Sequence, residues 1–279
     1  MPLKDLLLNL YRFIFARKIF YKFNLHLYKI TLRGIGVLNS EGEQITGEEK
    51  FLSLLGQSKE IKTIFDVGAN DGGYSQTVRK YFPRAQIYAF EPQPESFERL
   101  KKVSRSCGLK IYKLGMGNKQ GLTKIWDFAD DAKLKDTQPT STLASLYKEV
   151  IEKYHGQKAK SFNIKITTLD EFTKKNSIKT IDFIKIDTEG NEYQILLGAK
   201  NLIRTDKIRV IQFEFNEMNA YSKTFFKDFY DLLTNFRFYR LLPDGPVELG
   251  QYRPLNYEIF GFQNIVAVNN NYSEIIALF

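Results

Sequence analysis

Acidic side chains and one lysine follow two short apolar runs in the second half of the chain. One run contains Lys185 and leads into Asp187 and Glu189, and the other leads into Glu214. Both runs are rich in β-branched and aromatic residues, which predicts strands, and the carboxyl ends of parallel strands meet at one edge of a sheet. A lysine inside a strand buried on both faces needs a charged partner. The spacing therefore indicates a cluster of ionisable groups that can take a proton from a substrate.

The acids of this cluster differ in the roles that their positions favour. Asp187 is the first candidate for a general base and Glu214 is the second, while Glu189 is expected to hold the substrate or Lys185. Two of these carboxylates also provide oxygen ligands of the kind that a divalent cation prefers. A structural ion-pair network at the strand ends is the alternative interpretation. His155 has the chemistry of a base, but nothing in its sequence position supports that role.

A second chemical signal lies in the segment 64–73, IFDVGANDGG, where a predicted strand turns into a helix. Gly68 and Gly72 lack side chains and allow the backbone to approach a ligand closely, and Asp66 and Asn70 offer polar groups beside it. The spacing is not the G-x-G-x-x-G of dinucleotide sites, and no lysine follows as in a phosphate-binding loop. The turn therefore indicates a ligand site but disfavours a nucleotide diphosphate, and an ordinary strand-to-helix turn is the alternative interpretation.

The next predicted strand ends in Glu91, which lies 25 residues after Asp66. A carboxylate at this place can accept hydrogen bonds from both hydroxyls of a ribose, and Pro92 ends the strand there. After the third strand, the turn 115–118 brings Asn118, whose amide is a candidate for reading an adenine edge. Gly-Asn pairs are common in ordinary turns, so this last signal is the weakest of the set.

Short β-rich runs alternate with helical periods from residue 61 onward, which predicts parallel βαβ units and five principal parallel strands. Six runs are expected to be strands, five of them the principal members of the parallel sheet: 64–67, 86–90, 110–114, 163–168, 181–186 and 208–213. The expected helices are 74–82, 95–107, 143–154, 169–175, 193–203 and 223–236. Closing strands are expected at 239–242 and 260–268, and a loop at 126–140. Three polar residues at and just after the end of this loop, Thr140, Ser141 and Thr142, are candidates for lining the pocket of the substrate.

The composition favours one globular domain, because hydrophobic residues make up 43% of the chain and no Pro-, Gly- or Ser-rich linker divides it. The domain is expected to occupy residues 41–279. Cys107 is the single cysteine, so no intramolecular disulfide forms and no cysteine-based zinc site is expected. No metal site is assigned, and a reducing, cytoplasmic location is expected.

Residues 1–40 form a basic arm that carries seven basic residues and one acidic residue, Asp5. The arm therefore accounts for six of the nine net positive charges of the chain. The remaining domain is nearly neutral, which argues against a nucleic-acid groove. Charges interrupt the apolar residues too often for a transmembrane helix or a signal peptide. On a helix, the basic strip comprises Lys18, Lys22, His26, Lys29 and Arg33. The sequence allows three roles for this arm: packing on the domain, self-association, or peripheral contact with the inner face of a membrane.

Several segments together resemble one family: DVGAN at 66–70 with Gly72, FEP at 90–92, TLD at 168–170, KIDTEG at 185–190 and NIVAV at 264–268. Over about residues 61–268 the chain is similar to the FkbM methyltransferases. The resemblance implies an α/β fold: a doubly wound, mostly parallel, seven-stranded Rossmann-like sheet with an antiparallel closing strand.

The resemblance also implies S-adenosylmethionine as cofactor, bound over Asp66, Gly68, Asn70 and Glu91, and methylation of a hydroxyl group. The implied acceptor is a sugar, a polysaccharide or a related glycoconjugate, with a polyketide or another small molecule as the alternative. A non-catalytic binding protein that keeps the cofactor fold is a rival from another class. A nicotinamide dehydrogenase is disfavoured by the glycine spacing.

Overall fold

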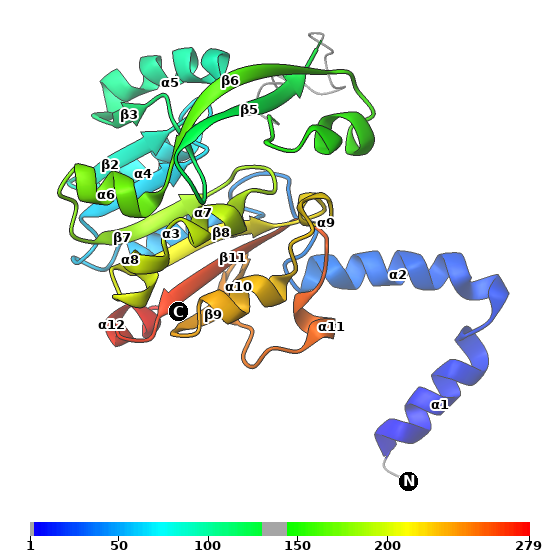
Figure 1. Cartoon of the computed structure of the whole chain (residues 1–279). Coiled ribbons are helices and arrows are strands. Elements are labelled where there is room, and N and C mark those ends of the chain that lie inside the picture. The colour runs from blue at the N-terminus through cyan, green and yellow to red at the C-terminus, as the bar shows by residue number, and fades with distance from the viewer. Residues whose placement is uncertain (1–2, 130–143) are drawn as a thin grey trace.

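A large twisted sheet forms the centre of the protein in the computed structural model, which describes residues 3–129 and 144–279. Within these residues the sheet has eight strands in the order β10-β9-β11-β8-β7-β1-β2-β3 (Figure 1). The parallel part consists of β3 (Lys110–Tyr112), β2 (Gln86–Phe90), β1 (Thr63–Val67), β7 (Ile181–Ile186) and β8 (Ile208–Phe215). The remaining part consists of β11 (Gln263–Asn269), β9 (Phe236–Leu242) and β10 (Gly245–Glu248).

The expected fold class is confirmed, because five strands run parallel and β11 runs antiparallel between β8 and β9. The eighth strand, β10, was not expected. It pairs antiparallel with β9 in a hairpin at the edge of the sheet. The segment reads as turn-rich because it contains Gly245 and Pro246, and proline is tolerated in a strand only at such an edge.

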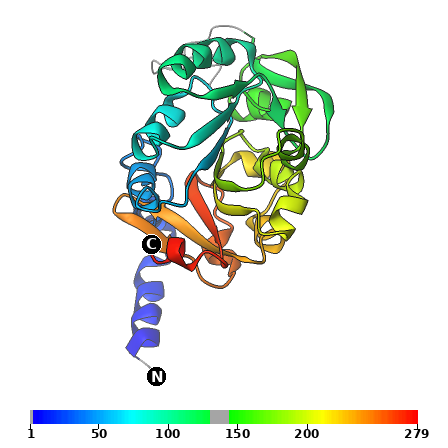
Figure 2. The same ribbon diagram turned by 90° about the vertical axis from the view of Figure 1, so that its left-hand side faces the viewer.

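Helices cover both faces of the sheet (Figure 2). One face packs against α3 (Glu48–Leu55), α4 (Gly73–Tyr81) and α12 (Ser273–Ile276), with α5 (Pro94–Cys107) beside α4. The other face packs against α6 (Leu169–Lys175), α7 (Glu192–Leu197), α8 (Lys200–Arg204), α10 (Phe226–Leu232) and α11 (Pro254–Tyr257). Successive residues of β7 point to opposite faces, and all six are buried, as expected for a strand covered on both sides. The short helix α9 (Met218–Ser222) follows β8.

A second, three-stranded sheet is formed by β4 (Gly115–Met116), β5 (Gly121–Phe128) and β6 (Ala159–Thr167). The expected strand 163–168 therefore does not join the parallel series, since β6 pairs antiparallel with β5 and parallel with β4. Residues 126–128 belong to β5, although a loop was expected there. Sequence periodicity identified β6 as a strand but carries no information about which sheet a strand joins.

The helix expected over 143–154 is shorter in the structure, where a π-helical turn η3 spans Val150–Tyr154. The three candidate pocket residues Thr140, Ser141 and Thr142 lie outside the described residues. Several other boundaries also differ from the expected ones, and α3 was missed.

The basic arm projects away from the rest of the molecule as two helices, α1 (Leu3–Phe15) and α2 (Tyr21–Gly34), joined by a short 3-10 turn η1 (Lys18–Phe20) (Figure 1). The basic strip was expected on a single helix, but Lys18 lies in η1 and its other members lie in α2. Asn24 of α2 donates from its Nδ2 to the carbonyl of Phe15 and accepts from the hydroxyl of Tyr11, which fixes the bend. Among the described residues, no helix combines the length and the apolar character needed to cross a membrane. The domain boundary at residue 40 stays a prediction.

Close packing of the backbone requires a glycine at the end of β1, in addition to any need for ligand access. Gly68 has a φ of +85°, and a Cβ there would lie 1.7 Å from the carbonyl oxygen of Asp187. The amide of Asp187 donates to the carbonyl of Val67, so the ends of β1 and β7 lie in direct contact. Gly72 faces Leu100 on α5, where a Cβ would approach within 2.9 Å. Both glycines therefore allow neighbouring elements to pack closely.

This contact predicts a large loss of stability for Gly68→Ala. The new Cβ would collide with backbone that cannot move aside, and the left-handed φ adds strain, so we expect the free energy of unfolding to fall by about 3 kcal/mol or more. The matched control is Gly73→Ala, where a Cβ would meet only an ordinary contact at 3.5 Å. Urea denaturation measures both variants. Equal stability of the two would contradict the proposed packing of β1 against β7.

Candidate active site

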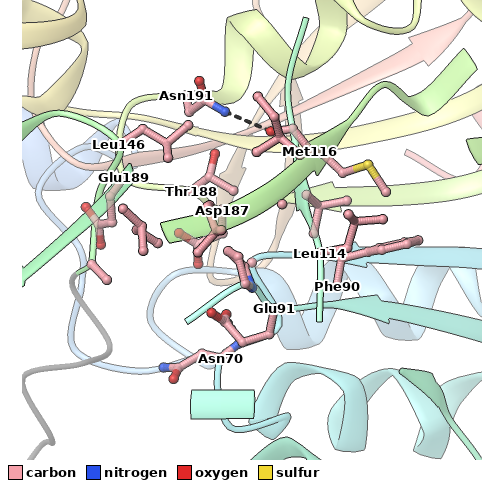
Figure 3. A pocket seen from close by; sticks show the side chains of 18 residues that line it. Asn70, Phe90, Glu91, Leu114, Met116, Leu146, Asp187, Thr188, Glu189 and Asn191 are labelled. Carbon is pink, nitrogen blue, oxygen red and sulfur yellow. Dashed lines mark hydrogen bonds between the residues drawn. The ribbon is translucent and has the colours of Figure 1, made fainter. Parts of the chain in front are cut away.

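A cavity lies where β1, β2 and β7 end, and 18 residues line it (Figure 3). The apolar part of its wall comes from β2, the second sheet and the segments beside them, and includes Phe90, Leu114, Met116, Ile125, Leu146, Ile164 and Ile166. The polar part comes from the segments that follow β1, β2 and β7, and includes Asn70, Glu91, Asp187, Thr188, Glu189 and Asn191. An apolar slot with a few polar groups on one side is typical of a small-molecule or cofactor site.

Glu91 is buried at the polar side of this cavity, next to Asn70 (Figure 3). Its Oε2 accepts a hydrogen bond from the amide of Asn70 at 2.9 Å, and its Oε1 accepts one from the amide of Gln93 at 2.7 Å. Burial raises the pKa of Glu91 to about 7, although both amides oppose that shift. Each carboxylate oxygen has two acceptor sites, so each retains one for a ligand hydroxyl. The geometry fits the ribose-binding role expected for this residue.

The other residues expected to bind the cofactor divide into two groups. Gly68 and Asn70 line the cavity with Glu91. Asp66 and Gly72 are not among its lining residues: Asp66 is buried beneath the turn and accepts a 2.6 Å hydrogen bond from the hydroxyl of Ser75. Asn118 also lies outside the lining and donates to the side chain of Gln194 at 2.6 Å.

Lys185 is buried in β7 as expected, with a side chain only 7% exposed. Its ammonium donates to Oδ2 of Asp187 at 2.6 Å and lies 4.6 Å from the ring centre of Tyr74. Burial lowers the pKa of Lys185, but the negative charges of Asp187 and Glu48 outweigh burial, and the pKa is raised above its ordinary value. The lysine is therefore charged, and it orients Asp187 at the edge of the cavity.

Sequence reasoning missed the polar contacts that lie next to Lys185. Gln212 of β8 donates to Glu48 at 2.7 Å and accepts from the hydroxyl of Tyr74 at 2.6 Å. Glu48 is buried at the start of α3, and burial raises its pKa. No sequence signal marks Glu48, because an acid in the first turn of a helix usually only complements the helix dipole. The fold alone brings it toward β7 and β8.

A larger cavity of about 890 Å³ adjoins the first and shares Gly68, Asn70, Asp187 and Glu189 with it. Its remaining lining residues include Glu214, Glu217, Tyr154, His155, and Lys29 and Arg33 of α2. The structure thus brings the three predicted acids Asp187, Glu189 and Glu214 to one cavity, with Lys185 beneath them. A substrate would have room in this cavity, beside the apolar slot.

The groups in this cavity differ in protonation. Desolvation raises the pKa of Glu189 to about 8, with help from the charge of Asp187, and raises the pKa of Glu214 well above its ordinary value. Desolvation lowers the pKa of His155, so its ring is neutral near pH 7. The Nε2 atom of His155 is buried and has no hydrogen-bond partner among the described residues. His155 therefore has the positional support that its place in the sequence did not provide.

Within residues 3–129 and 144–279, no group of three or more His, Cys, Asp or Glu side chains is arranged to hold a metal ion.

Comparison with known families places this site in context. The model of the methyltransferase FkbM domain matches residues 66–240, which is more than half of the chain. This chain belongs to the FkbM methyltransferase family. The match covers the β1 turn, Glu91 and the segment 185–190, which contribute polar residues to the wall of the cavity described above.

Two curated relatives of this FkbM methyltransferase have names that state what they methylate: an oxygen in one case and a hexuronic acid in the other. One is the 2-O-methyltransferase NoeI of Sinorhizobium fredii, 22% identical over 70% of this chain and 80% of its own length. Another is the hexuronic acid methyltransferase AglP of Haloferax volcanii, 23% identical over 60% of this chain and 63% of its own length. Among solved structures, the methyltransferase FkbM from Methylobacillus flagellatus is 12% identical, has a TM-score of 0.44, and is matched over 74% of this chain and 43% of its own.

The turn after β7 in this FkbM methyltransferase is held by Glu192. Its Oε1 accepts hydrogen bonds from the amide and the hydroxyl of Thr188, at 2.8 and 2.9 Å, and a longer one from the amide of Gly190. Glu189 stands in this turn with a φ of +54°, which is uncommon for a residue with a side chain. Burial raises the pKa of Glu192 to about 7, and its Oε2 has no hydrogen-bond partner among the described residues.

These shifts predict that the protein loses stability as the pH rises through neutrality. The pKa of Glu192 is about 7 in the folded state against an ordinary value of 4.5, so its contribution is fully present below pH 4.5 and is lost as the pH passes 7. Glu192→Gln cannot ionise and should flatten the decline in unfolding free energy between about pH 5 and pH 8. Urea denaturation across that range measures the slope.

Glu171→Gln is the matched control, because Glu171 is an exposed carboxylate on α6. It should leave the slope unchanged. A Glu192→Gln protein that declines as steeply as the parent would contradict the raised pKa.

Proposed function

We propose that this methyltransferase transfers a methyl group from S-adenosylmethionine to a hydroxyl of a sugar-containing acceptor. One observation carries the proposal: the buried carboxylate of Glu91 faces an apolar slot that adjoins a cavity where Asp187, Glu189 and Glu214 meet. The first feature suits a nucleoside, and the second suits a polar acceptor that must lose a proton. The name of NoeI supports an oxygen as the methylated atom, and the name of AglP supports a sugar as the acceptor.

The residues of the slot suit each part of the cofactor. The free acceptor sites of Glu91 suit the ribose hydroxyls, and Phe90, Leu114 and Met116 provide apolar contacts for an adenine ring. Gly68 and Asn70 border both cavities, which suits the methionine portion. When bound, the cofactor supplies a methyl group already activated by a sulfonium. The protein must then align the acceptor oxygen and remove its proton.

Asp187 is the proposed proton acceptor. Its Oδ2 is engaged by Lys185, which leaves Oδ1 for the acceptor hydroxyl, and the ion pair holds the carboxylate in one orientation. The pKa of Glu189 is about 8, so near pH 7 this residue is suited to donate a hydrogen bond to the acceptor and less suited to take its proton. Burial raises the pKa of Glu214 as well and favours its protonated form. His155 is the alternative base, because it is neutral and its Nε2 is unpaired among the described residues.

The cofactor assignment predicts that Glu91→Gln weakens S-adenosylmethionine binding by about tenfold or more, since a charged acceptor to two hydroxyls is lost. Turnover at saturating cofactor should stay near normal, because ribose contacts differ little between the ground state and the transition state. Calorimetric titration measures the affinity. Glu98→Gln, which removes an exposed carboxylate of α5, is the control.

Titration with NAD provides a second check on this assignment. Unchanged S-adenosylmethionine affinity in Glu91→Gln would remove Glu91 from the ribose site. Binding of NAD in place of S-adenosylmethionine would overturn the proposed cofactor. Cofactor binding without turnover on any hydroxyl-bearing sugar would favour a non-catalytic binding protein.

The proton-acceptor assignment predicts that Asp187→Asn lowers turnover by about 10²–10⁴, the usual effect of losing a general base. Cofactor affinity should change little, because the asparagine keeps the size of the side chain. His155→Asn should retain most of the activity, and Glu214→Gln should change the KM for the acceptor more than kcat. Full turnover of Asp187→Asn together with a loss in His155→Asn would move the base to His155. Full turnover of all three would mean that alignment alone carries the reaction.

A further inference from the structure

The arm exposes more apolar surface than is usual for a pair of helices surrounded by water. None of the residues of α1 is buried, and its large side chains stand open to solvent: Leu3 72%, Leu6 53%, Leu7 57%, Leu8 48%, Leu10 53%, Tyr11 42%, Phe13 71% and Ile14 42%. Ile19, Tyr21 and Phe23 continue this surface with exposures of 84%, 68% and 52%. Exposed apolar patches of this extent mark an interaction surface.

The apolar residues of α1 lie on one side of the helix. At about 100° per residue, all of them except Leu8 and Phe15 fall within about 160° of one another, whereas Asp5 and Arg12 lie on the opposite side. The helix is thus amphipathic and has its apolar face in solvent. Its arrangement is typical of a helix that lies in an interface between a polar and an apolar phase.

The positive charge of the arm indicates which kind of partner binds to this apolar surface. Seven basic residues stand against Asp5, so two arms packed on each other would bring two strongly positive segments together. A transmembrane course is not supported, because no helix of the described residues is long and apolar enough to span a bilayer. An anionic lipid surface matches both features, since lipid chains accept the apolar face and the headgroups attract Lys and Arg.

We propose that α1, η1 and α2 form a docking surface for an anionic membrane, with α1 lying in the plane of the interface. The bend fixed by Asn24 holds the two helices at an angle, and α2 connects the docked helix to the methyltransferase domain (Figure 1). Aromatic residues suit this location, and Tyr11, Phe13, Phe15, Phe20 and Tyr21 gather around the bend.

Docking has a consequence for the site. Lys29 and Arg33 of α2 line the larger cavity, so the helix that connects to the membrane also forms part of the wall of the acceptor site. An acceptor attached to a membrane lipid would reach the cavity without leaving the bilayer surface. This consequence rests on the proposed function, whereas the docking itself does not.

The test is co-sedimentation of the full chain with vesicles of phosphatidylcholine containing about 30% phosphatidylglycerol, compared with vesicles of phosphatidylcholine alone. We expect binding to the anionic vesicles, weakened by salt because the attraction of the headgroups is screened. The charge variant replaces Lys4, Lys18 and Lys22 with Glu and should lower the partition coefficient by about tenfold or more. Its control replaces Lys119, Lys179 and Lys200 with Glu, which changes the net charge equally but lies outside the arm.

The apolar contribution is tested separately with Leu7→Ser and Phe13→Ser in one protein. Leu122→Ser and Val247→Ser form the control, because these side chains are exposed on β5 and β10. The arm pair should weaken vesicle binding, and the control pair should not. None of these residues lines the cavities of the site, so calorimetric binding of S-adenosylmethionine should be unchanged in every variant and reports on correct folding.

Two results would overturn the proposal. The first is equal sedimentation of the parent and the arm variants with anionic vesicles. The second is the absence of vesicle binding together with an arm-dependent dimer in light scattering, which would assign the apolar face to a second copy of the chain. Since the assay uses no methyl acceptor, its failure leaves the proposed function untouched, and a failed methylation assay leaves the docking untouched.

Discussion

The buried ammonium group of Lys185 is the constraint on which the candidate site depends. An unpaired charge in a strand covered on both faces would be strongly destabilising, so the surrounding elements must bring negative charge to it. Asp187 provides the direct partner at 2.6 Å, and Glu48, Glu214 and Asp66 contribute at longer range. These acids come from four parts of the chain. The lysine thus links α3 and the ends of three strands into one polar centre.

The same low-solvent environment explains why several carboxyl groups have raised pKa values. One lysine cannot neutralise all the acids gathered at this edge, and desolvation favours the protonated forms of Glu91, Glu189, Glu192 and Glu214. The site therefore combines a fixed ion pair with acids that change charge near neutral pH. A site of this kind can hold polar hydroxyls by hydrogen bonds while keeping one carboxylate as a proton acceptor.

The apolar half of the site has a different origin. The second sheet supplies Met116, Ile125, Ile164 and Ile166 to the wall of the apolar slot, opposite the strand ends that carry the acids. Its strand β6 has an alternating pattern of burial, because one side faces the cavity and its neighbours while the other faces solvent. The segments at the ends of the parallel strands thus supply most of the ionisable side chains of the site, and the smaller sheet supplies much of its apolar wall.

The sequence by itself determined the parallel sheet, the turn at Gly68, the position of Glu91 at the cavity and the convergence of Asp187, Glu189 and Glu214. These features follow from local patterns, because a β-rich run that ends in a polar residue places that residue at the common edge of a parallel sheet. Tertiary structure alone decided that Asp66 and Asn118 lie outside the cavity, and that Glu48 and His155 lie beside the acids. It also decided that β6 joins the second sheet. These outcomes depend on contacts between segments far apart in the chain, such as Gln212 with Glu48, and no local pattern of residues encodes such a contact.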